Sequence, residues 1–364
     1  MIRLHQLITA LISAALLLPA CGGQTSTEES AVATPESQVT EEGGTESEAM
    51  TETGEDVDET VAVVSDEGFP RTITDGAGRE LTFDVPPERL VTYYNDSFGM
   101  LATLGVMPVA QSVNTEMLTD PIYFGEAGVN IATIGYNDAP DLEDVVAARP
   151  DLVLVYSVEE AQVLDGIAPA FVTLDPATLE ELYASVRLYG EMLGLEDKAE
   201  AVVQRFQDRL NAYAKANEAN AEQTILKLAS YDGQFSVATT ADPVCQMLDV
   251  VATCEWKPSA PDEGWGYDTS IEGVLELDPD IIIFNNWTDD SFEEILAEVE
   301  ANPLWGELSA VQNGRVYSTP GYDNPIASSL PAAQKVLDTY IPKMFPDVFD
   351  GPLTDEEVQE TLAQ

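Results

Sequence analysis

Histidine is almost absent from this sequence. The only one is His5, close to the N-terminus, so no imidazole is available in the rest of the chain. This excludes a Ser-His-Asp hydrolase triad, the histidine-rich sites of zinc and manganese carriers, and histidine-ligated haem. No glycine-rich phosphate-binding loop follows a predicted strand, so a nucleotide-binding site built on such a loop is also excluded.

Basic residues are scarce as well. Fifteen Lys and Arg stand against 66 Asp and Glu, and the formal net charge is −51. Such a surface repels nucleic acid and anionic lipid headgroups, so we expect no nucleic-acid partner. An anionic ligand would need locally clustered Arg or Tyr, and the sequence shows no Arg cluster. The acidic composition is equally explained as an adaptation to solubility, for example in high salt.

Long hydrophobic runs are missing, with one exception near the N-terminus. Residues 7–20, "LITALISAALLLPA", follow Arg3 and are too short to cross a bilayer as a mature helix. We interpret residues 1–20 as an export signal peptide. Cys21 follows at once and resembles the Cys of a bacterial lipobox. This resemblance implies cleavage before Cys21, lipidation of that residue and an extracytoplasmic, membrane-anchored protein; an ordinary signal peptide is the alternative.

Aromatic residues are almost absent from residues 21–66, which are rich in Thr, Ser, Glu and Gly. Such a segment cannot bury enough surface to fold, so we predict a disordered acidic tether. Only Cys245 and Cys254 remain in the body after it. A disulfide between them requires the intervening helix to end near Thr253 and the chain to turn back. Two free buried thiols are the alternative.

The body alternates strands and helices, which predicts parallel sheets covered on both faces. Two stretches within residues 178–220 show apolar residues at helical spacing, and the second is long enough to form a rigid helix that connects two lobes. We therefore expect an α/β fold with two Rossmann-like lobes and parallel-rich sheets. The predicted parts are an N-terminal lobe (67–195), one long interlobe helix (196–221) and a C-terminal lobe with a last helix and tail (222–364).

One helix-to-strand unit occurs twice. "DLEDVVAARPDLVLVYS" (141–157) aligns with "SIEGVLELDPDIIIFNN" (270–286), and Glu143 corresponds to Glu272 at a constant offset of 129 residues. A Pro-Asp followed by aliphatic residues is a common junction between a helix and a strand. The glutamate, however, occupies the same position in both copies, which suggests that the two lobes have equivalent structures.

The sequence over about residues 69–346 resembles the substrate-binding proteins of ABC importers for iron–siderophore complexes, haem and cobalamin. The stretches that carry the resemblance are "RTITDGAGRELTFDVPPERLV", "LGVMPVAQS", "APDLEDVVAARPDLVLV", "SIEGVLELDPDIIIF" and "LWGELSAVQNGRVYST". The resemblance implies two lobes bridged by a single long helix, a ligand in the cleft between them and limited closure. It also implies that Glu143 and Glu272 dock on Arg of a permease dimer with its cytoplasmic ATPase.

A caged iron chelate needs aromatic faces and a few polar groups rather than protein ligands to the metal. Loops that follow the predicted strands supply such residues, and Phe235 lies close to one of them. Direct Fe(III) ligation by the adjacent Tyr93 and Tyr94 is disfavoured, because neighbours on a strand point to opposite faces. Arg187 is expected to be solvated. The predicted ligand contacts are Tyr93, Tyr94, Asn95, Tyr231, Trp265, Tyr267, Trp287 and Tyr322.

Without clustered Arg, a neutral or cationic hydroxamate-type Fe(III)-siderophore is the favoured ligand, and cobalamin or haem is the alternative. The chelate is the cargo; no cofactor and no protein-ligated metal are expected. We expect a monomer and no enzyme activity. Two readings of another class stay open: a sensor that docks on a receptor, and an extracellular carboxylate hydrolase.

Overall fold

The computed structural model describes residues 68–112, 115–135, 140–174, 176, 178–231, 234–239, 242–254, 266–285, 292–319 and 329–364. The chain divides into two units, Met1–Val57 and Asp58–Gln364, and every described residue belongs to the second unit. The predicted signal peptide, Cys21 and the tether therefore lie outside the described residues.

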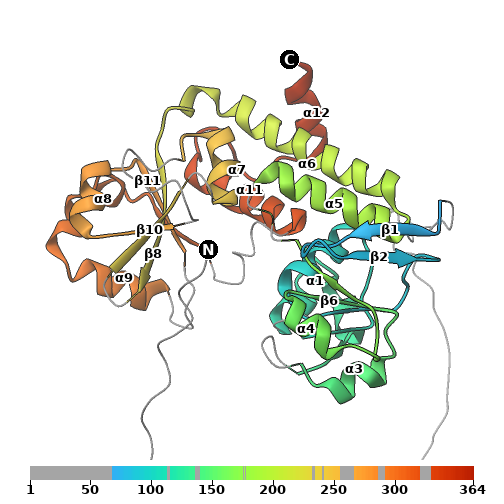
Figure 1. Cartoon of the computed structure of the whole chain (residues 1–364). Helices are drawn as coiled ribbons and strands as arrows, with labels where there is room; N and C mark the ends of the chain where they lie inside the picture. The colour runs from blue at the N-terminus through green and yellow to red at the C-terminus, as the bar shows by residue number, and fades with distance from the viewer. Residues whose placement is uncertain are drawn as a thin grey trace, which may run out of the picture. The chain divides into compact units, whose positions relative to one another are not determined.

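The N-terminal lobe is built on a five-stranded parallel sheet in the order β5-β4-β3-β6-β7. Figure 1 labels its strand β6 and the nearby helices α1, α3 and α4. A separate antiparallel hairpin, β1-β2, precedes it. The elements are β1 (Arg71–Thr74), β2 (Glu80–Phe83), β3 (Leu90–Thr92), α1 (Asn95–Thr103), β4 (Ala110–Gln111), α2 (Thr115–Thr119), η1 (Gly125–Asn130), β5 (Ala132–Thr133), α3 (Leu142–Ala148), β6 (Leu152–Val155), α4 (Val158–Val163), β7 (Ala170–Val172) and α5 (Leu179–Leu193).

The C-terminal lobe repeats this strand order as β10-β9-β8-β11-β12. The long helix α6 (Glu196–Ala216) leads into it. Its elements, with the last two helices, are η2 (Glu218–Asn220), β8 (Ile225–Tyr231), β9 (Gln234–Ala238), α7 (Pro243–Val251), β10 (Gly266–Thr269), α8 (Ile271–Leu277), β11 (Ile281–Asn285), α9 (Phe292–Glu300), η3 (Pro303–Glu307), α10 (Ser309–Gln312), β12 (Val316–Thr319), α11 (Leu330–Met344) and α12 (Asp355–Ala363).

The second sheet differs from the first in one respect, because β9 runs antiparallel to both of its neighbours. Only two residues, Asp232 and Gly233, separate β8 from β9. A parallel connection needs a crossover of a dozen or more residues, whereas Asp-Gly is a favoured hairpin connection. The length of this connection thus explains why the C-terminal sheet is mixed while the N-terminal sheet is wholly parallel.

Alternating residues of the central strands pack on opposite faces of each sheet. In β6, Leu152 and Leu154 belong to the largest core cluster, while Val153 and Val155 belong to a separate cluster with Val145 of α3. In β11 the same alternation sends Ile281 and Ile283 to the largest cluster and Ile282 and Phe284 to the other face. Burial on both faces explains the continuous aliphatic runs in the sequence.

Helix α6 spans 21 residues, or about 32 Å at the usual helical rise. Arg209, buried on α6, donates to Asp338 of α11 at 2.8 Å and pairs with Asp355 of α12 at 3.4 Å. On the N-terminal side, Lys335 of α11 pairs with Asp120 at 2.9 Å. Arg209 therefore ties α6 to both α11 and α12, and Lys335 ties α11 to the N-terminal lobe.

The hairpin β1-β2 protects the edge strand β7. Gly76 donates its backbone N–H to the carbonyl of Val172 at 2.8 Å, and Val172 donates to the carboxylate of Asp75 at 3.1 Å. A Cβ on Gly76 would lie 2.2 Å from the carbonyl oxygen of Thr173. The turn thus approaches the strand so closely that only glycine fits.

We expect Gly76→Ala to lower the free energy of unfolding by about 1–3 kcal/mol, the usual cost of overpacking. The measurement is chemical denaturation of the purified body. Gly306→Ala is the matched control, because a Cβ there meets nothing within 4 Å. Equal stability of the two variants would show that the turn does not depend on this close contact.

Candidate functional site

Both lobes have a topological switch point, where the chain order of the strands reverses across the sheet. It lies between β3 and β6 in the first sheet and between β8 and β11 in the second. In open α/β sheets, ligands bind outside the carboxyl ends of the strands at such a point. The residues that follow β3, β6, β8 and β11 are therefore the candidate ligand site.

At the first switch point, Tyr94 and Tyr156 lie together. Tyr94 follows β3 and Tyr156 follows β6, and their ring centroids are 5.5 Å apart at an interplanar angle of 55°. Tyr94 is half-buried, while Tyr156 is 49% exposed. The hydroxyl of Tyr94 donates to Glu160, in the first turn of α4. We call Tyr94, Tyr156 and Glu160 the N-terminal rim.

The carboxylate of Glu160 is held by three donors. Its Oε1 accepts from the hydroxyl of Tyr94, and its Oε2 accepts from the backbone N–H groups of Tyr156 at 2.8 Å and Ser157 at 3.1 Å. Ser157 caps α4 in return, which completes a capping box. The first turn of α4 thus holds the Tyr94 hydroxyl and the backbone of Tyr156 and Ser157 in place.

Buried polar atoms without partners gather near the same edges. Among the described residues, five buried side-chain polar atoms make no hydrogen bond, and four of them lie at the carboxyl ends of the two central strands: Thr92 Oγ1, Tyr93 Oη, Asn95 Oδ1 and Ser230 Oγ. Most buried polar groups in proteins are paired. These two strand ends therefore hold unused hydrogen-bonding capacity.

Tyr93 and Tyr94 differ in burial, although both contact the same core cluster. Tyr93 is 2% exposed and packs in the core cluster beside α3 and α4, whereas Tyr94 belongs to the rim. Burial, and after it the negative charge of Glu160, raises the pKa of Tyr93 to about 12. The hydroxyl of Tyr93 is therefore protonated at neutral pH.

The predicted residues of the C-terminal lobe are only partly described. Tyr231 is the last residue of β8, at the switch point, and Tyr267 pairs with Val237 within the edge strand β10. Trp265, Trp287 and Tyr322 lie outside the described residues. Phe235 is buried in the core, with its ring stacked on that of Trp305 at 6.2 Å.

The repeated unit of the sequence corresponds to matched helices. Glu143 lies in the first turn of α3 and Glu272 in the first turn of α8, and both side chains are exposed. A hydrogen bond with the side chain of Ser270 lowers the pKa of Glu272, which keeps it ionised. The surroundings differ in one way: Leu142 is 38% exposed, while its counterpart Ile271 is 5% exposed.

The rest of the repeated unit has a structural role. Both helices end on a residue with a left-handed backbone, Arg149 and Asp278, at φ angles of 48° and 43°. Asp151 then accepts from the backbone N–H of Arg89 at 2.9 Å, and Asp280 accepts from that of Thr224 at 2.9 Å. These bonds fix the chain before β3 and before β8. The repeated aspartate thus serves the fold, whereas the exposed glutamates make no comparable contact with a neighbouring strand.

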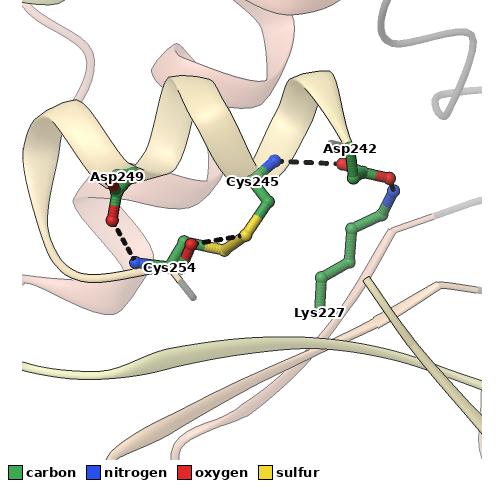
Figure 2. The surroundings of a disulfide bond; sticks show 5 residues. All are labelled: Lys227, Asp242, Cys245, Asp249 and Cys254. Carbon is green, nitrogen blue, oxygen red and sulfur yellow. Dashed lines mark hydrogen bonds and ion pairs between the residues drawn. A yellow bond between two sulfur atoms is a disulfide. The ribbon is translucent and has the colours of Figure 1, made fainter. Parts of the chain in front are cut away.

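Cys245 and Cys254 form a disulfide, with their Cα atoms 5.2 Å apart (Figure 2). The bridge is possible because α7 ends at Val251 and the chain turns back. Asp242 caps this helix by accepting from the N–H of Cys245 at 3.0 Å, and it pairs with Lys227 of β8 at 2.6 Å.

Other predicted features lie away from the rim. Arg187 pairs with Glu200 at 2.7 Å, which joins α5 to α6 at the surface. Within the described residues, no group of three or more His, Cys, Asp or Glu side chains is arranged to hold a metal ion. Nor is any described helix both long and apolar enough to pass through a membrane.

Sequence reasoning missed Tyr156 and Glu160. Tyr156 directly follows the aliphatic run of the repeated unit, just as Tyr93 and Tyr94 directly follow the neighbouring strand β3. Its position after a strand could therefore have identified it as a candidate ligand contact. The contact between Tyr94 and Glu160 spans 66 residues and depends on β3 and β6 being neighbours.

Residues 90–322 match a protein-family model described as periplasmic binding protein. The chain belongs to this family. Among curated members, the uncharacterized ABC transporter substrate-binding lipoprotein YvrC of Bacillus subtilis is 25% identical over 299 residues, covering 78% of this chain and 88% of that protein. The iron(3+)-hydroxamate-binding protein FhuD of the same organism is 27% identical over 240 residues, covering 64% and 73%.

Solved structures of periplasmic binding proteins share the fold. Staphylococcus aureus SirA, in complex with staphyloferrin B, superposes with a TM-score of 0.62 at 19% identity, covering 76% of this chain and 97% of that one. The α/β architecture predicted from the sequence is confirmed by this likeness and by the two sheets themselves.

Proposed function

We propose that this periplasmic binding protein captures an Fe(III)-siderophore complex, of hydroxamate type, between its two lobes and delivers it to the permease of an ABC importer. The observation that carries the proposal is the chemistry of the N-terminal rim, where two tyrosine rings lie beside a carboxylate and none of the three described side chains is basic. One of the curated relatives is an iron(3+)-hydroxamate-binding protein. Aromatic faces with few polar groups suit a caged chelate whose metal is already fully coordinated.

The charges at the strand ends support the choice of ligand class. Relatives named for Fe(3+)-citrate binding are 22% and 23% identical to this chain, so a citrate chelate is the second candidate. Such an anion needs basic partners, and the rim offers a carboxylate instead. A hydroxamate chelate, neutral or cationic, fits that surface better. Trp265, Trp287, Tyr231, Tyr267 and Tyr322 are the proposed contacts from the other lobe.

Delivery rests on the two exposed glutamates and on the predicted N-terminal anchor. Glu143 and Glu272 offer one carboxylate from each lobe at equivalent helix starts, which suits a permease of two matching halves with paired Arg. Lipidation of Cys21 would hold the body at the outer face of the membrane on its acidic tether. The alternatives of a receptor-docking sensor and of a carboxylate hydrolase gain no support from the relatives, which include substrate-binding proteins of transporters.

Equilibrium dialysis tests the proposed ligand class directly. Purified body, starting near Phe69, is dialysed against three chelates labelled with radioactive iron: a trihydroxamate, citrate and a tricatecholate. We expect the trihydroxamate to bind with a Kd below about 1 μM, equivalent to about −8 kcal/mol, and the two anionic chelates to bind more weakly. If the iron–citrate chelate binds more tightly than the trihydroxamate, the ferric citrate complex becomes the proposed ligand. No binding of any iron chelate would refute it.

A further inference from the structure

Helix α3 of the N-terminal lobe leaves part of an apolar face open to solvent. Leu142 is 38% exposed and Val146 is 52% exposed, and because they are four residues apart they are neighbours on the helix surface. Val145 of the same helix is fully buried in the core cluster that also holds residues of β6. The exposed pair therefore lies on a side of α3 that the lobe does not use for its own packing.

The repeated helix α8 of the C-terminal lobe has the same two positions covered. Leu142 corresponds to Ile271, which is 5% exposed, and Val146 corresponds to Leu275, which is partly buried. Ile271 belongs to the core cluster that contains Trp305 of η3, and Leu275 packs against that cluster. The C-terminal lobe thus shows that a short helical segment with an apolar side chain can cover this part of the repeated unit.

The covering segment is supplied by a longer connection between strands. In the C-terminal lobe, residues 286–315 connect β11 to β12 and include η3 and α10. Ser309, at the start of α10, donates its backbone N–H to Asp278, the C-cap of α8, at 2.7 Å. In the N-terminal lobe, residues 156–169 connect β6 to β7, are all described and contain the single helix α4. The shorter connection explains why the apolar pair of α3 stays exposed.

Charge decides which kind of partner suits this face. Asp141, Glu143 and Asp144 are exposed acids at the start of the same helix. A second copy of the chain carries the same net charge of −51, and anionic lipid headgroups are also negative, so both are repelled. An apolar segment that carries a basic residue is attracted instead. Glu143 is proposed above to meet an Arg of the permease, and it lies three residues from Val146 on the helix surface.

We infer that Leu142 and Val146 make an apolar contact with the permease beside Glu143. The occupant is a short segment of the outward-facing surface of the permease that carries an apolar side chain together with the Arg. This inference rests on the proposed function and deepens it, because the N-terminal lobe adds apolar burial to its ion pair. The C-terminal lobe covers the equivalent face of α8 with its own chain and has no such pair to offer.

The first test measures uptake of a radioactive Fe(III) trihydroxamate by cells that lack the wild-type copy and carry the full chain with Leu142→Ser and Val146→Ser. We expect uptake to fall about tenfold, because two apolar side chains no longer leave water on docking. Chelate affinity of the purified variant should be unchanged. Its melting temperature should also stay near that of the wild type, since exposed side chains contribute little to stability.

Val250→Ser combined with Val348→Ser is the matched control. These side chains are 42% and 37% exposed, similar to the pair on α3, and they lie in the C-terminal lobe outside α3 and α8. Uptake by this variant should stay close to that of the wild type. An equal loss in the control would overturn the inference, because any loss of exposed apolar surface would then lower uptake.

The second test identifies the partner by photo-crosslinking in intact cells. Val146 is replaced by a photo-crosslinking amino acid in the full chain, and Val250 is replaced in the same way as the control. We expect position 146, and not position 250, to crosslink to an integral-membrane ABC permease, identified by mass spectrometry of the adduct. A crosslink to a second copy of this chain, or no permease adduct, would contradict the inference.

The outcomes separate this inference from the proposed function. If the variant with Leu142→Ser and Val146→Ser supports normal uptake, the apolar contact is wrong while chelate binding stands. If that variant loses chelate affinity, the pair belongs to the ligand site and not to the docking surface. If the wild-type protein binds no iron chelate and its deletion leaves uptake normal, the proposed function fails and this inference fails with it.

Discussion

Replacing Glu143 and Glu272 together by arginine should abolish uptake of the chelate and leave its affinity for the binding protein unchanged. Each glutamate is exposed at the start of a helix in equivalent places of the two lobes. Exposed ion pairs contribute only about 0–1 kcal/mol in water, but reversed charges at a docked interface repel the Arg of the partner and slow association. Each single change should reduce uptake partially.

The measurement combines uptake of labelled iron, in cells that lack the wild-type copy, with chelate titration of the purified variants. Asp144→Arg and Glu276→Arg are the matched controls, because both are exposed acids on the same two helices without a counterpart in the other lobe. Their uptake should stay close to that of the wild type. Normal uptake by the double variant would remove the docking role, and lost chelate affinity in either single variant would place that glutamate in the ligand site.

Lys227→Met should destabilise the C-terminal lobe by about 3–5 kcal/mol, because it leaves the buried carboxylate of Asp242 without its partner. The two side chains are each 8% exposed, and their charged atoms lie 2.6 Å apart (Figure 2). In a protein of this size, that loss corresponds to a fall of about 5–8 °C in the melting temperature. Differential scanning calorimetry of wild type and variant measures it.

Adding Asp242→Asn to Lys227→Met should restore part of the lost stability. Asparagine keeps the cap on the N–H of Cys245 and removes the unpaired charge. A single variant that loses less than about 1 kcal/mol, or a double variant no more stable than the single one, would mean that water already screens Asp242.

The repeated unit allowed much of the fold to be predicted from the sequence. A shared Pro-Asp junction and aliphatic run predicted a helix and strand in each lobe, and α3-β6 and α8-β11 follow that prediction, with the same left-handed residue ending each helix. These features are local, because they depend on backbone preferences within a few residues and on burial of an alternating strand.

Three features of the structure were not predicted from the sequence. The reversal of β9 follows from a two-residue connection whose effect becomes clear only once the ends of β8 and β9 are known. The last helix, α12, was assigned to a tail, although Thr354 and Glu357 form a capping box that marks its start. Tyr156 and Glu160 were missed because Tyr94 meets them only where β3 and β6 are neighbours, and the alternation of strands and helices does not specify which strands are neighbours.

Native mass spectrometry of the protein purified from iron-starved cells of its own organism tests the central claim most directly. The account predicts a folded species heavier than the apoprotein by one organic chelate with one iron atom, recognised by the isotope pattern of iron and released on denaturation. The released chelate should carry hydroxamate groups and no net negative charge. A cobalt-containing or haem adduct, or an adduct without metal, would contradict the assignment of an iron–siderophore as the cargo.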